Sequence, residues 1–267
     1  MKEFFGFGGY NRIPEGYMSW QHLTFVTILM VIMVTLAIYL GMKNRYKLAS
    51  DKNKVLIWAA ILIDGFELFK IILCCFRGND PFGWLYNLPL FLCSIQLITI
   101  PLAAFSKGRV KESALDFVFI FGILGAVLGT YAAGQNYAAY PVLSFDNVVS
   151  GITHSISGFS SLYIAISGMA SMKRKNLPIT FSILFGFAIA AYIANITLDY
   201  NYMFLMAGDG TPYDIIYNLV NGNKVIYPLS VILLFVVYIF VFHTIYSVCT
   251  SRSTLTTKET ETSQKRV

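Results

Sequence analysis

The segment VLIWAAILIDGFELFKIILCCF, residues 55–76, is an apolar run that carries three ionisable residues, Asp64, Glu67 and Lys70. A charged group near the middle of a membrane-spanning helix costs about 2.5 to 3.5 kcal/mol, so such residues rarely face lipid. At spacing i, i+3, i+6 the three side chains lie along one flank of a helix. The segment therefore predicts a transmembrane helix whose polar flank faces protein or a polar cavity.

The composition of the whole chain predicts an all-α, polytopic membrane protein. The mean hydropathy is +0.63 and only 13% of the 267 residues are charged, a balance typical of membrane proteins and not of soluble ones. Seven segments are apolar and long enough to cross about 30 Å of hydrocarbon. They are residues 20–41, 55–76, 84–106, 114–133, 151–172, 178–199 and 225–248. We therefore expect a single seven-helix transmembrane domain over residues 20–248.

Basic residues predict how these seven helices are oriented. They cluster after the first, third, fifth and seventh spans, at Lys43, Arg45, Lys47, Lys52, Lys54, Lys107, Arg109, Lys111, Lys173, Arg174, Lys175, Arg252, Lys258, Lys265 and Arg266. Because basic loops stay inside, we expect the N-terminus outside and the C-terminus inside the cell membrane. Residues 1–19 then form an extracytoplasmic interfacial segment, and residues 249–267 a disordered cytoplasmic tail.

The net charge of +6 follows from this topology and from contact with anionic lipid. Membrane lipids are therefore the expected partners, and nothing in the charge pattern requires nucleic acid. The four cysteines match no disulfide framework and no zinc spacing, and the three histidines are far apart, so we expect no metal and no cofactor. Gly125 and Gly129 form a small-residue face, which serves packing within the bundle or, alternatively, a homodimer.

In this topology, polar residues gather in the outer halves of at least five helices. They include His22, Glu67, Lys70, His154, Asn195, Asp199 and Asn201. An outward-facing polar cavity explains this distribution. The alternatives are a structural ion pair between Glu67 and Lys70, and interfacial cap roles for His22 and His154.

The third span holds the most reactive candidate, Cys93, in the sequence LPLFLCSIQ, residues 88–96. If Pro89 is the first helical residue, Cys93 lies about one turn into the helix. There the helix dipole and a nearby imidazole would stabilise a thiolate. If the helix instead begins at Trp84, Pro89 kinks it and Cys93 lies about 14 Å deep. Gln96, in the same sequence, is a candidate for binding or orienting a substrate.

Several motifs along the chain resemble one known family. They are Ser19-Trp20-Gln21-His22, Leu88 to Ser94, His154, and Asn201-Tyr202-Met203-Phe204-Leu205 followed by Pro212. Together they resemble the bacterial YwaF-type integral membrane proteins, which are related to the vertebrate transmembrane-protein-164 acyltransferases. In bacterial members we expect a histidine two residues before the cysteine, where this chain has Phe91.

The resemblance implies a seven-helix bundle and, for the eukaryotic relatives, transfer of fatty acyl chains between lipids through a cysteine. Carried over to this sequence, it makes Cys93 the nucleophile and His154 its base. A third group must then orient the base, and Glu67 or Asp199 are candidates. Lys70 or Asn195 would polarise the scissile carbonyl or hold a phosphate.

Two classes of function remain open from the sequence. The first is a membrane-embedded acyltransferase or lipid hydrolase, in which Cys93 and His154 react and the remaining polar residues bind or orient the substrate. These are His22, Glu67, Lys70, Gln96, Asn195, Asp199 and Asn201. The second is a small-solute transporter or binding protein with no covalent chemistry, which holds its solute near Glu67 and Lys70. The chain shows no internal repeat of the kind that carriers use, which weighs against the second class.

Overall fold

The computed structural model describes residues 2–264 of the chain, and the side chains of residues 2–250. Its regular elements are all helices, and the described residues contain no strand. In chain order the elements are α1 (Trp20–Asn44), α2 (Ala49–Gly78), η1 (Gly83–Asn87), α3 (Gln96–Phe105), α4 (Gly108–Tyr131), α5 (Gly134–Ala139), α6 (Phe145–Ile166), η2 (Arg174–Asn176), α7 (Leu177–Leu198), η3 (Tyr202–Phe204), α8 (Tyr213–Leu219) and α9 (Ile226–Gln264).

Four helical segments are long and apolar enough to cross a membrane. They are Trp20–Asn44, Gly108–Ala139, Arg174–Leu198 and Ile226–Thr250. The all-helical membrane class predicted from the sequence is therefore confirmed. The other three expected spans coincide with α2, which carries the charged flank, with the short helix α3, and with α6.

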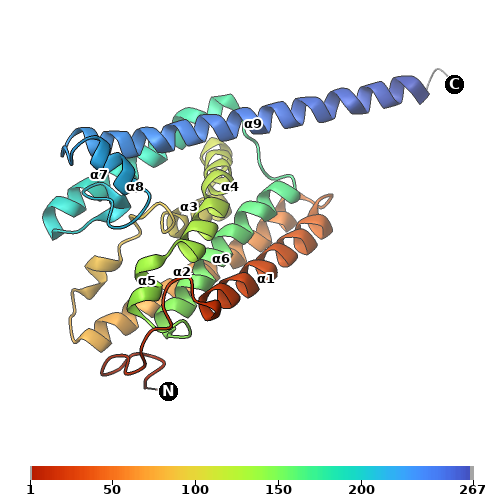
Figure 1. Ribbon diagram of the computed structural model, residues 1–267. Helices are drawn as coiled ribbons and strands as arrows, with labels where there is room; N and C mark the ends of the chain where they lie inside the picture. The colour runs from red at the N-terminus through yellow and green to blue at the C-terminus, as the bar shows by residue number, and fades with distance from the viewer. Residues whose placement is uncertain (1, 265–267) are drawn as a thin grey trace.

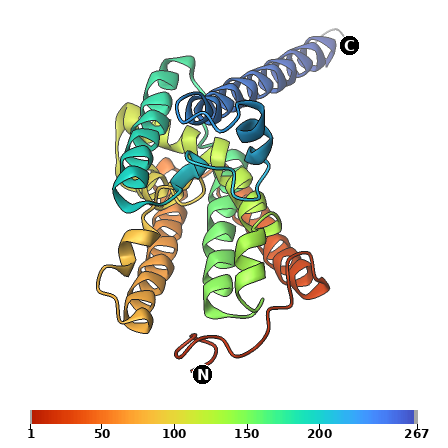
Figure 2. The same cartoon turned by 60° about the vertical axis from the view of Figure 1, so that its left-hand side comes forward.

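Helix α4 lies at the centre of the arrangement (Figure 1). It packs most extensively against α6, and it also contacts α3 and α7. One buried cluster joins α4 to α2, α3 and α6, and a second joins it to α7 and α9. In Figure 2, α4 accordingly stands between a group containing α1, α2 and α6 and a group containing α7, α8 and α9.

The expected third span is not one continuous helix, so both predicted starting points, Pro89 and Trp84, are wrong. Residues Gly83–Asn87 form a short 3-10 helix, Leu88 is extended, and α3 begins only at Gln96. An extended residue is what a following proline favours, and Pro89 has no N–H with which to continue the first helix. Cys93 therefore lies in the turn just before α3.

The expected fifth span begins earlier than residue 151, because the sequence contains a helix cap upstream of it. Ser144 has extended backbone dihedrals, and its Oγ accepts the N–H of Asn147 at 3.4 Å. A serine in this position satisfies one of the N–H groups that an α-helix leaves free at its start. Helix α6 consequently runs from Phe145 to Ile166.

The stretches that carry most of the basic residues, 43–54, 107–111 and 173–175, meet at one end of the molecule, which we call the basic end. Lys52 Nζ donates to the carbonyl of Ser167 at 2.7 Å. Lys111 Nζ donates to Asn53 Oδ1 at 2.5 Å. The carboxylate of Asp116 accepts the N–H groups of the 171–172 backbone at 3.0 and 2.8 Å.

The remaining connections meet at the opposite end, together with the N-terminal segment. Arg77, in the last turn of α2, forms an ion pair with Asp146 at the start of α6, with an N–O distance of 2.7 Å. Gln135 Nε2 donates to the carbonyl of Asp209 at 2.9 Å. The helix ends thus fall into two groups, as the alternation of basic loops predicts.

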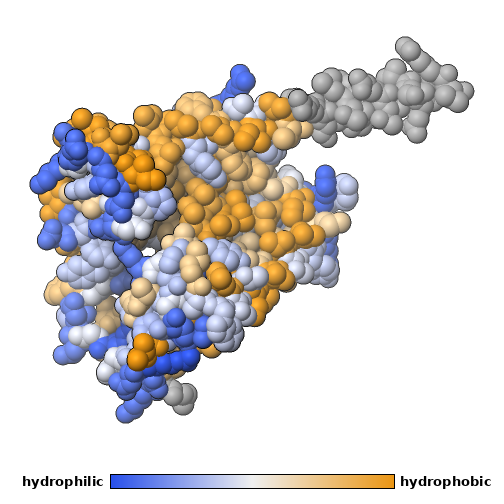
Figure 3. Space-filling model, in the orientation of Figure 1, coloured by the Kyte–Doolittle hydropathy of each residue, from blue (hydrophilic) through white to orange (hydrophobic). Residues whose placement is uncertain are grey.

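The surface in Figure 3 has apolar side chains over α1 and α9 and hydrophilic ones near the N-terminus and around α8. Exposed apolar residues on these two helices include Ile28, Val31, Leu36, Leu233, Val237 and Phe240. Such a continuous apolar surface is what a membrane-spanning helix presents to lipid. The expected tail, residues 249–267, extends beyond the described side chains, and its predicted disorder stays a prediction.

Candidate thiol-imidazole site

Cys93 lies in a closed turn at the start of α3, where it is half-buried. Ser94 Oγ accepts the N–H of Phe91 at 3.0 Å and donates to the carbonyl of Phe91 at 3.1 Å. The N–H of Ile95 donates to the same carbonyl at 2.9 Å. The cysteine therefore sits at the N-terminal end of α3, where the partial positive charge of the helix favours a thiolate.

The side chain of His154 on α6 forms a hydrogen bond with Cys93. Its Nδ1 lies 2.7 Å from the carbonyl oxygen of Ser150, one turn earlier on the same helix. A carbonyl can only accept, so Nδ1 carries the hydrogen of the neutral ring and Nε2 is left as the acceptor for the thiol. The Nδ1 atom of the His154 ring is thus held by Ser150, and no hydrogen bond to it from Glu67 or Asp199 is found among the described residues.

Backbone groups also point at the sulfur atom. The N–H groups of Cys93 and Ser94 form hydrogen bonds to Cys93 Sγ. Donors of this kind stabilise the charged form of an acid more than the neutral form. Together with the imidazole they make this turn a suitable place for a reactive thiolate.

Two glycines of α4 form the surface on which the pair rests. A Cβ placed on Gly125 would lie 3.4 Å from the Cα and Cβ of Cys93. A Cβ placed on Gly129 would lie 1.9 Å from Cδ2 and 2.1 Å from Nε2 of His154. Gly125 and Gly129 thus serve packing within the chain, which is one of the two roles expected of them.

Glu67 and Lys70 pair with each other on α2. The N–O distance is 2.5 Å, and their side chains are 13% and 18% exposed. Lys70 is also close enough to His154 to interact with it electrostatically. The charges of Glu67 and Lys70 therefore compensate one another.

Asn195 and the segment around Tyr202 support the Cys93 turn from α7. Asn195 Oδ1 accepts the N–H of Tyr202, and Asn195 Nδ2 donates to the carbonyl of the same residue. The Tyr202 hydroxyl donates to the carbonyl of Leu85 and accepts the N–H of Leu88 at 3.4 Å. The ring of Phe91 packs against Tyr202, with a centroid distance of 5.3 Å. Asn195 thus acts on the site through Tyr202.

Asp199 and Asn201 lie apart from the pair, beside a hollow of about 440 Å³ that Phe91 also lines. Asn201 Oδ1 accepts the N–H of Met206 at 2.8 Å, and its Nδ2 donates to Asp209. These bonds close the loop that follows α7. Asp199 is exposed and ends α7 in the left-handed conformation. The hollow reaches the Cys93 turn only at Phe91.

His22 is fully buried and uses both ring nitrogens within the protein. Its Nδ1 accepts the N–H of Met18 at 3.2 Å, and its Nε2 donates to the carbonyl of Thr130 at 3.0 Å. The ring also packs on Tyr137, with centroids 3.9 Å apart. Because no ring nitrogen is left for a substrate, His22 has the contacts of a structural residue.

Two roles near the site were not predicted from the sequence. One is that Ser150 holds the His154 ring, and the other is that the Tyr202 hydroxyl bonds the backbone at Leu85 and Leu88. Ser150 is one helical turn before His154, which is the only signal the sequence offers for it.

Gln96, a candidate for binding or orienting a substrate, is fully buried at the first position of α3. Its Oε1 accepts from Thr99 Oγ1 at 3.0 Å.

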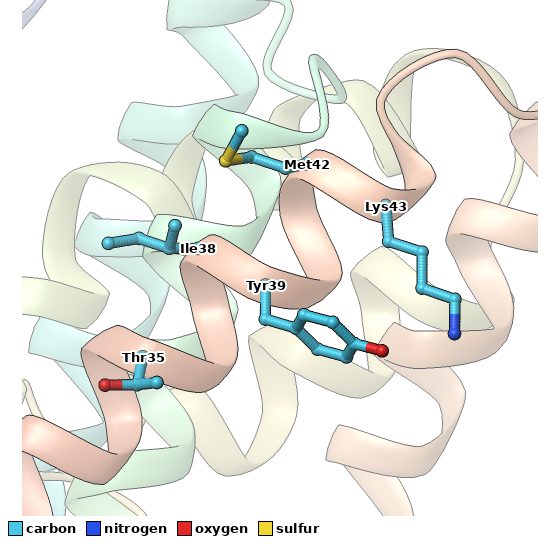
Figure 4. A pocket seen from close by; sticks show the side chains of 5 residues that line it. All are labelled: Thr35, Ile38, Tyr39, Met42 and Lys43. Carbon is cyan, nitrogen blue, oxygen red and sulfur yellow. The ribbon is translucent and has the colours of Figure 1, made fainter.

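A separate depression of about 540 Å³ lies on α1 (Figure 4). All of its lining side chains come from this one helix, namely Thr35, Ile38, Tyr39, Met42 and Lys43. Lys43 Nζ lies 5.5 Å from the centroid of the Tyr39 ring. The depression contains none of the candidate residues and belongs to the apolar outer surface.

The comparison with known protein families agrees with these observations. The family model of the TMEM164 family matches residues 17–250, from just before α1 to a point within α9. None of the curated proteins and none of the solved structures matches the chain significantly. The match extends over almost the entire sequence, and so this membrane protein belongs to the TMEM164 family.

Proposed function

We propose that the protein is a membrane-embedded lipid acyltransferase or lipid hydrolase, with Cys93 as nucleophile and His154 as general base. The observation that supports this most strongly is the hydrogen bond between the two side chains, with His154 oriented by the carbonyl of Ser150. A nucleophile, a base and a group that fixes the base form the arrangement that covalent catalysis requires. Membership of the TMEM164 family is consistent with the same chemistry.

The reaction has two halves. Cys93 Sγ attacks the carbonyl carbon of a lipid ester while its proton passes to His154 Nε2. The ester C–O bond then breaks, and His154 returns that proton to the departing oxygen, which leaves a lysolipid and an S-acyl Cys93. In the second half a hydroxyl group of another lipid, or water, attacks the thioester, gives its proton to His154, and restores the thiol.

We also propose that the seven expected helices all cross the cell membrane, with residues 1–19 outside and residues 249–267 inside. The grouping of the basic loops at one end of the molecule supports this orientation. The apolar surfaces of α1 and α9 support the membrane placement. In this orientation Cys93 and His154 are reached from the outer leaflet.

The carrier alternative has less support. Glu67 and Lys70, which would hold a solute, already compensate each other through a close ion pair. A solute would have to replace this pairing, and the desolvated charge left behind would be costly.

The proposed reaction is tested with the full chain in lipid vesicles and a lipophilic, thiol-reactive acyl probe. Cys93→Ser should abolish labelling, and His154→Ala should lower its rate by about a hundredfold, the usual effect of losing a general base. Cys249→Ser is the matched control, because Cys249 is exposed and far along α9. Labelling that persists at full strength in Cys93→Ser would overturn the thiol mechanism.

A further inference from the structure

The side-chain amide of Gln96 is buried without a partner. Gln96 has no exposed surface, and its Nε2 makes no hydrogen bond among the described residues. Its Oε1 is held by Thr99 Oγ1 at 3.0 Å, so only the donor end of the amide is left unused. Leaving a buried donor unpaired costs about 1–3 kcal/mol, and native structures keep few such groups.

The spacing along the chain places this amide on the same side of the turn as Cys93, the proposed nucleophile. Gln96 follows Cys93 by three residues in a turn that is already helical, since its N–H approaches the Cys93 carbonyl at 3.4 Å and the N–H of Leu97 bonds Ser94 at 3.0 Å. Side chains three positions apart lie on the same face of a helix. The N–H of Cys93 itself is directed at Sγ.

We infer that Gln96 Nε2, together with the backbone N–H of Cys93, forms an oxyanion hole for acyl transfer at Cys93. This inference rests on the function proposed above. When Sγ adds to the ester carbonyl, the π electron pair moves onto the carbonyl oxygen, and the two N–H groups donate to that negative charge. The pair returns when the C–O bond to the leaving group breaks, and His154 protonates the leaving oxygen.

An unpaired amide suits this role. Gln96 Nε2 has no bond to break during the reaction, whereas the Cys93 N–H passes from Sγ to the oxyanion as the sulfur loses its negative charge to the new S–C bond. Removing one donor of an oxyanion hole typically lowers the rate by about a hundredfold to a thousandfold.

Two probes of Cys93 separate this role from a structural one. An activated p-nitrophenyl acyl ester reacts through a tetrahedral oxyanion, whereas iodoacetamide alkylates the sulfur without one. Both rates are followed in vesicles by mass spectrometry of the peptide that contains Cys93. Gln96→Met and Gln96→Glu keep the length of the side chain and remove the N–H donor. Thr180→Val is the control, because Thr180 is equally buried but lies on α7.

We expect both Gln96 variants to be acylated about a hundredfold more slowly than the native chain and alkylated within about twofold of its rate. The control should match the native chain with both probes. Acylation of both variants at the native rate would overturn the inference and leave the proposed function standing. An equal fall in both rates would also overturn it, since Gln96 would then merely shape the turn. A native chain that is alkylated but never acylated would overturn the proposed function and this inference with it.

Discussion

At Gly129 the backbone of α4 passes so close to the His154 ring that one methyl group has no room. The same helix leaves space at Gly125 for ordinary contact with Cys93. Single residues therefore decide how near the imidazole comes to the thiol. The family resemblance already paired Cys93 with His154, but the sequence did not predict that Gly125 and Gly129 contact them, because contacts between α3, α4 and α6 depend on packing across the chain.

Gly129→Ala should lower the alkylation rate of Cys93 at neutral pH by about tenfold or more, since the imidazole must move and its bond to Ser150 must lengthen. Alanine stabilises a helix by up to about 1 kcal/mol relative to glycine, so a lower helical propensity of α4 would not account for a slower alkylation of Cys93. Gly186→Ala is the matched control, because no heavy atom lies within 4 Å of its added Cβ. Equal alkylation rates in the two variants would contradict the proposed contact.

His22→Leu should lower the melting temperature and leave the pH dependence of Cys93 alkylation unchanged. The substitution removes the partners of the Met18 N–H and the Thr130 carbonyl, and leaving the buried Thr130 carbonyl unpaired costs about 1–3 kcal/mol. Thermal unfolding and alkylation of the same preparation supply the two measurements. A variant that melts normally but loses acyl transfer would instead assign His22 to the reaction.

At the scale of elements, the Cys93 turn is held by contacts from a distant part of the sequence. Pro89 predicted an interruption near the right place, because its effect on the backbone is local. The start of α3 at Gln96 could not be predicted, since it depends on the Tyr202 hydroxyl and on the packing of Phe91 against the loop after α7. Apolar length alone predicts that the fifth span starts at residue 151, whereas the Ser144 cap sets the start of α6 at Phe145.

Tyr202→Phe should increase hydrogen exchange over residues 85–95 and slow the acylation of Cys93 severalfold. The ring remains, but the bonds from its hydroxyl to Leu85 and Leu88 are lost, at about 1 kcal/mol each. Tyr200→Phe is the control, because that ring also packs near Phe91. If exchange is unchanged in Tyr202→Phe, the clamp does not hold the turn.

The N-terminal segment should loosen in acid. Burial opposes the charge of Glu15, but the N–H of Val142 and the neighbouring Arg12 outweigh it and hold the pKa of Glu15 below its ordinary value of 4.5. A lowered pKa in the folded state means that the stabilisation is complete above about pH 4.5 and is lost as the pH falls through the folded value. Protection of the Val142 N–H from exchange should therefore stay constant above about pH 5 and fall as the pH drops below about 4.5. Glu15→Gln should lack this change, and persistent protection of the native chain in acid would contradict the assignment.

At the scale of the whole molecule, the composition was enough to predict a helical membrane protein, because soluble proteins rarely have so high an apolar content. The two groups of helix ends also followed, since the basic loops at 43–54, 107–111 and 173–175 alternate along the chain. The predicted outward-facing polar cavity does not gather all of the polar candidates. His22 is enclosed within the protein, and Asn201 holds its own loop, because each found closer backbone partners.

The proposed orientation can be measured in intact cells with a membrane-impermeant maleimide. In a Cys249→Ser background, Lys224→Cys should be labelled from outside, and Lys107→Cys only after the membrane is permeabilised. Both lysines are exposed, and they lie in connections at opposite ends of the helices. The reverse pattern would place the N-terminus inside.

The shortness of α3 has a consequence for any lipid that reacts at Cys93. Ten residues of helix measure about 15 Å, half the thickness of the hydrocarbon layer. The proposed orientation places the Phe105 end of α3, next to the basic stretch 107–111, at the cytoplasmic boundary, and the sulfur then lies near the midplane, well below the level at which phospholipid esters normally reside. The ester must then descend among the helices before it reacts, and the scarcity of water at that depth would favour an incoming alcohol over hydrolysis.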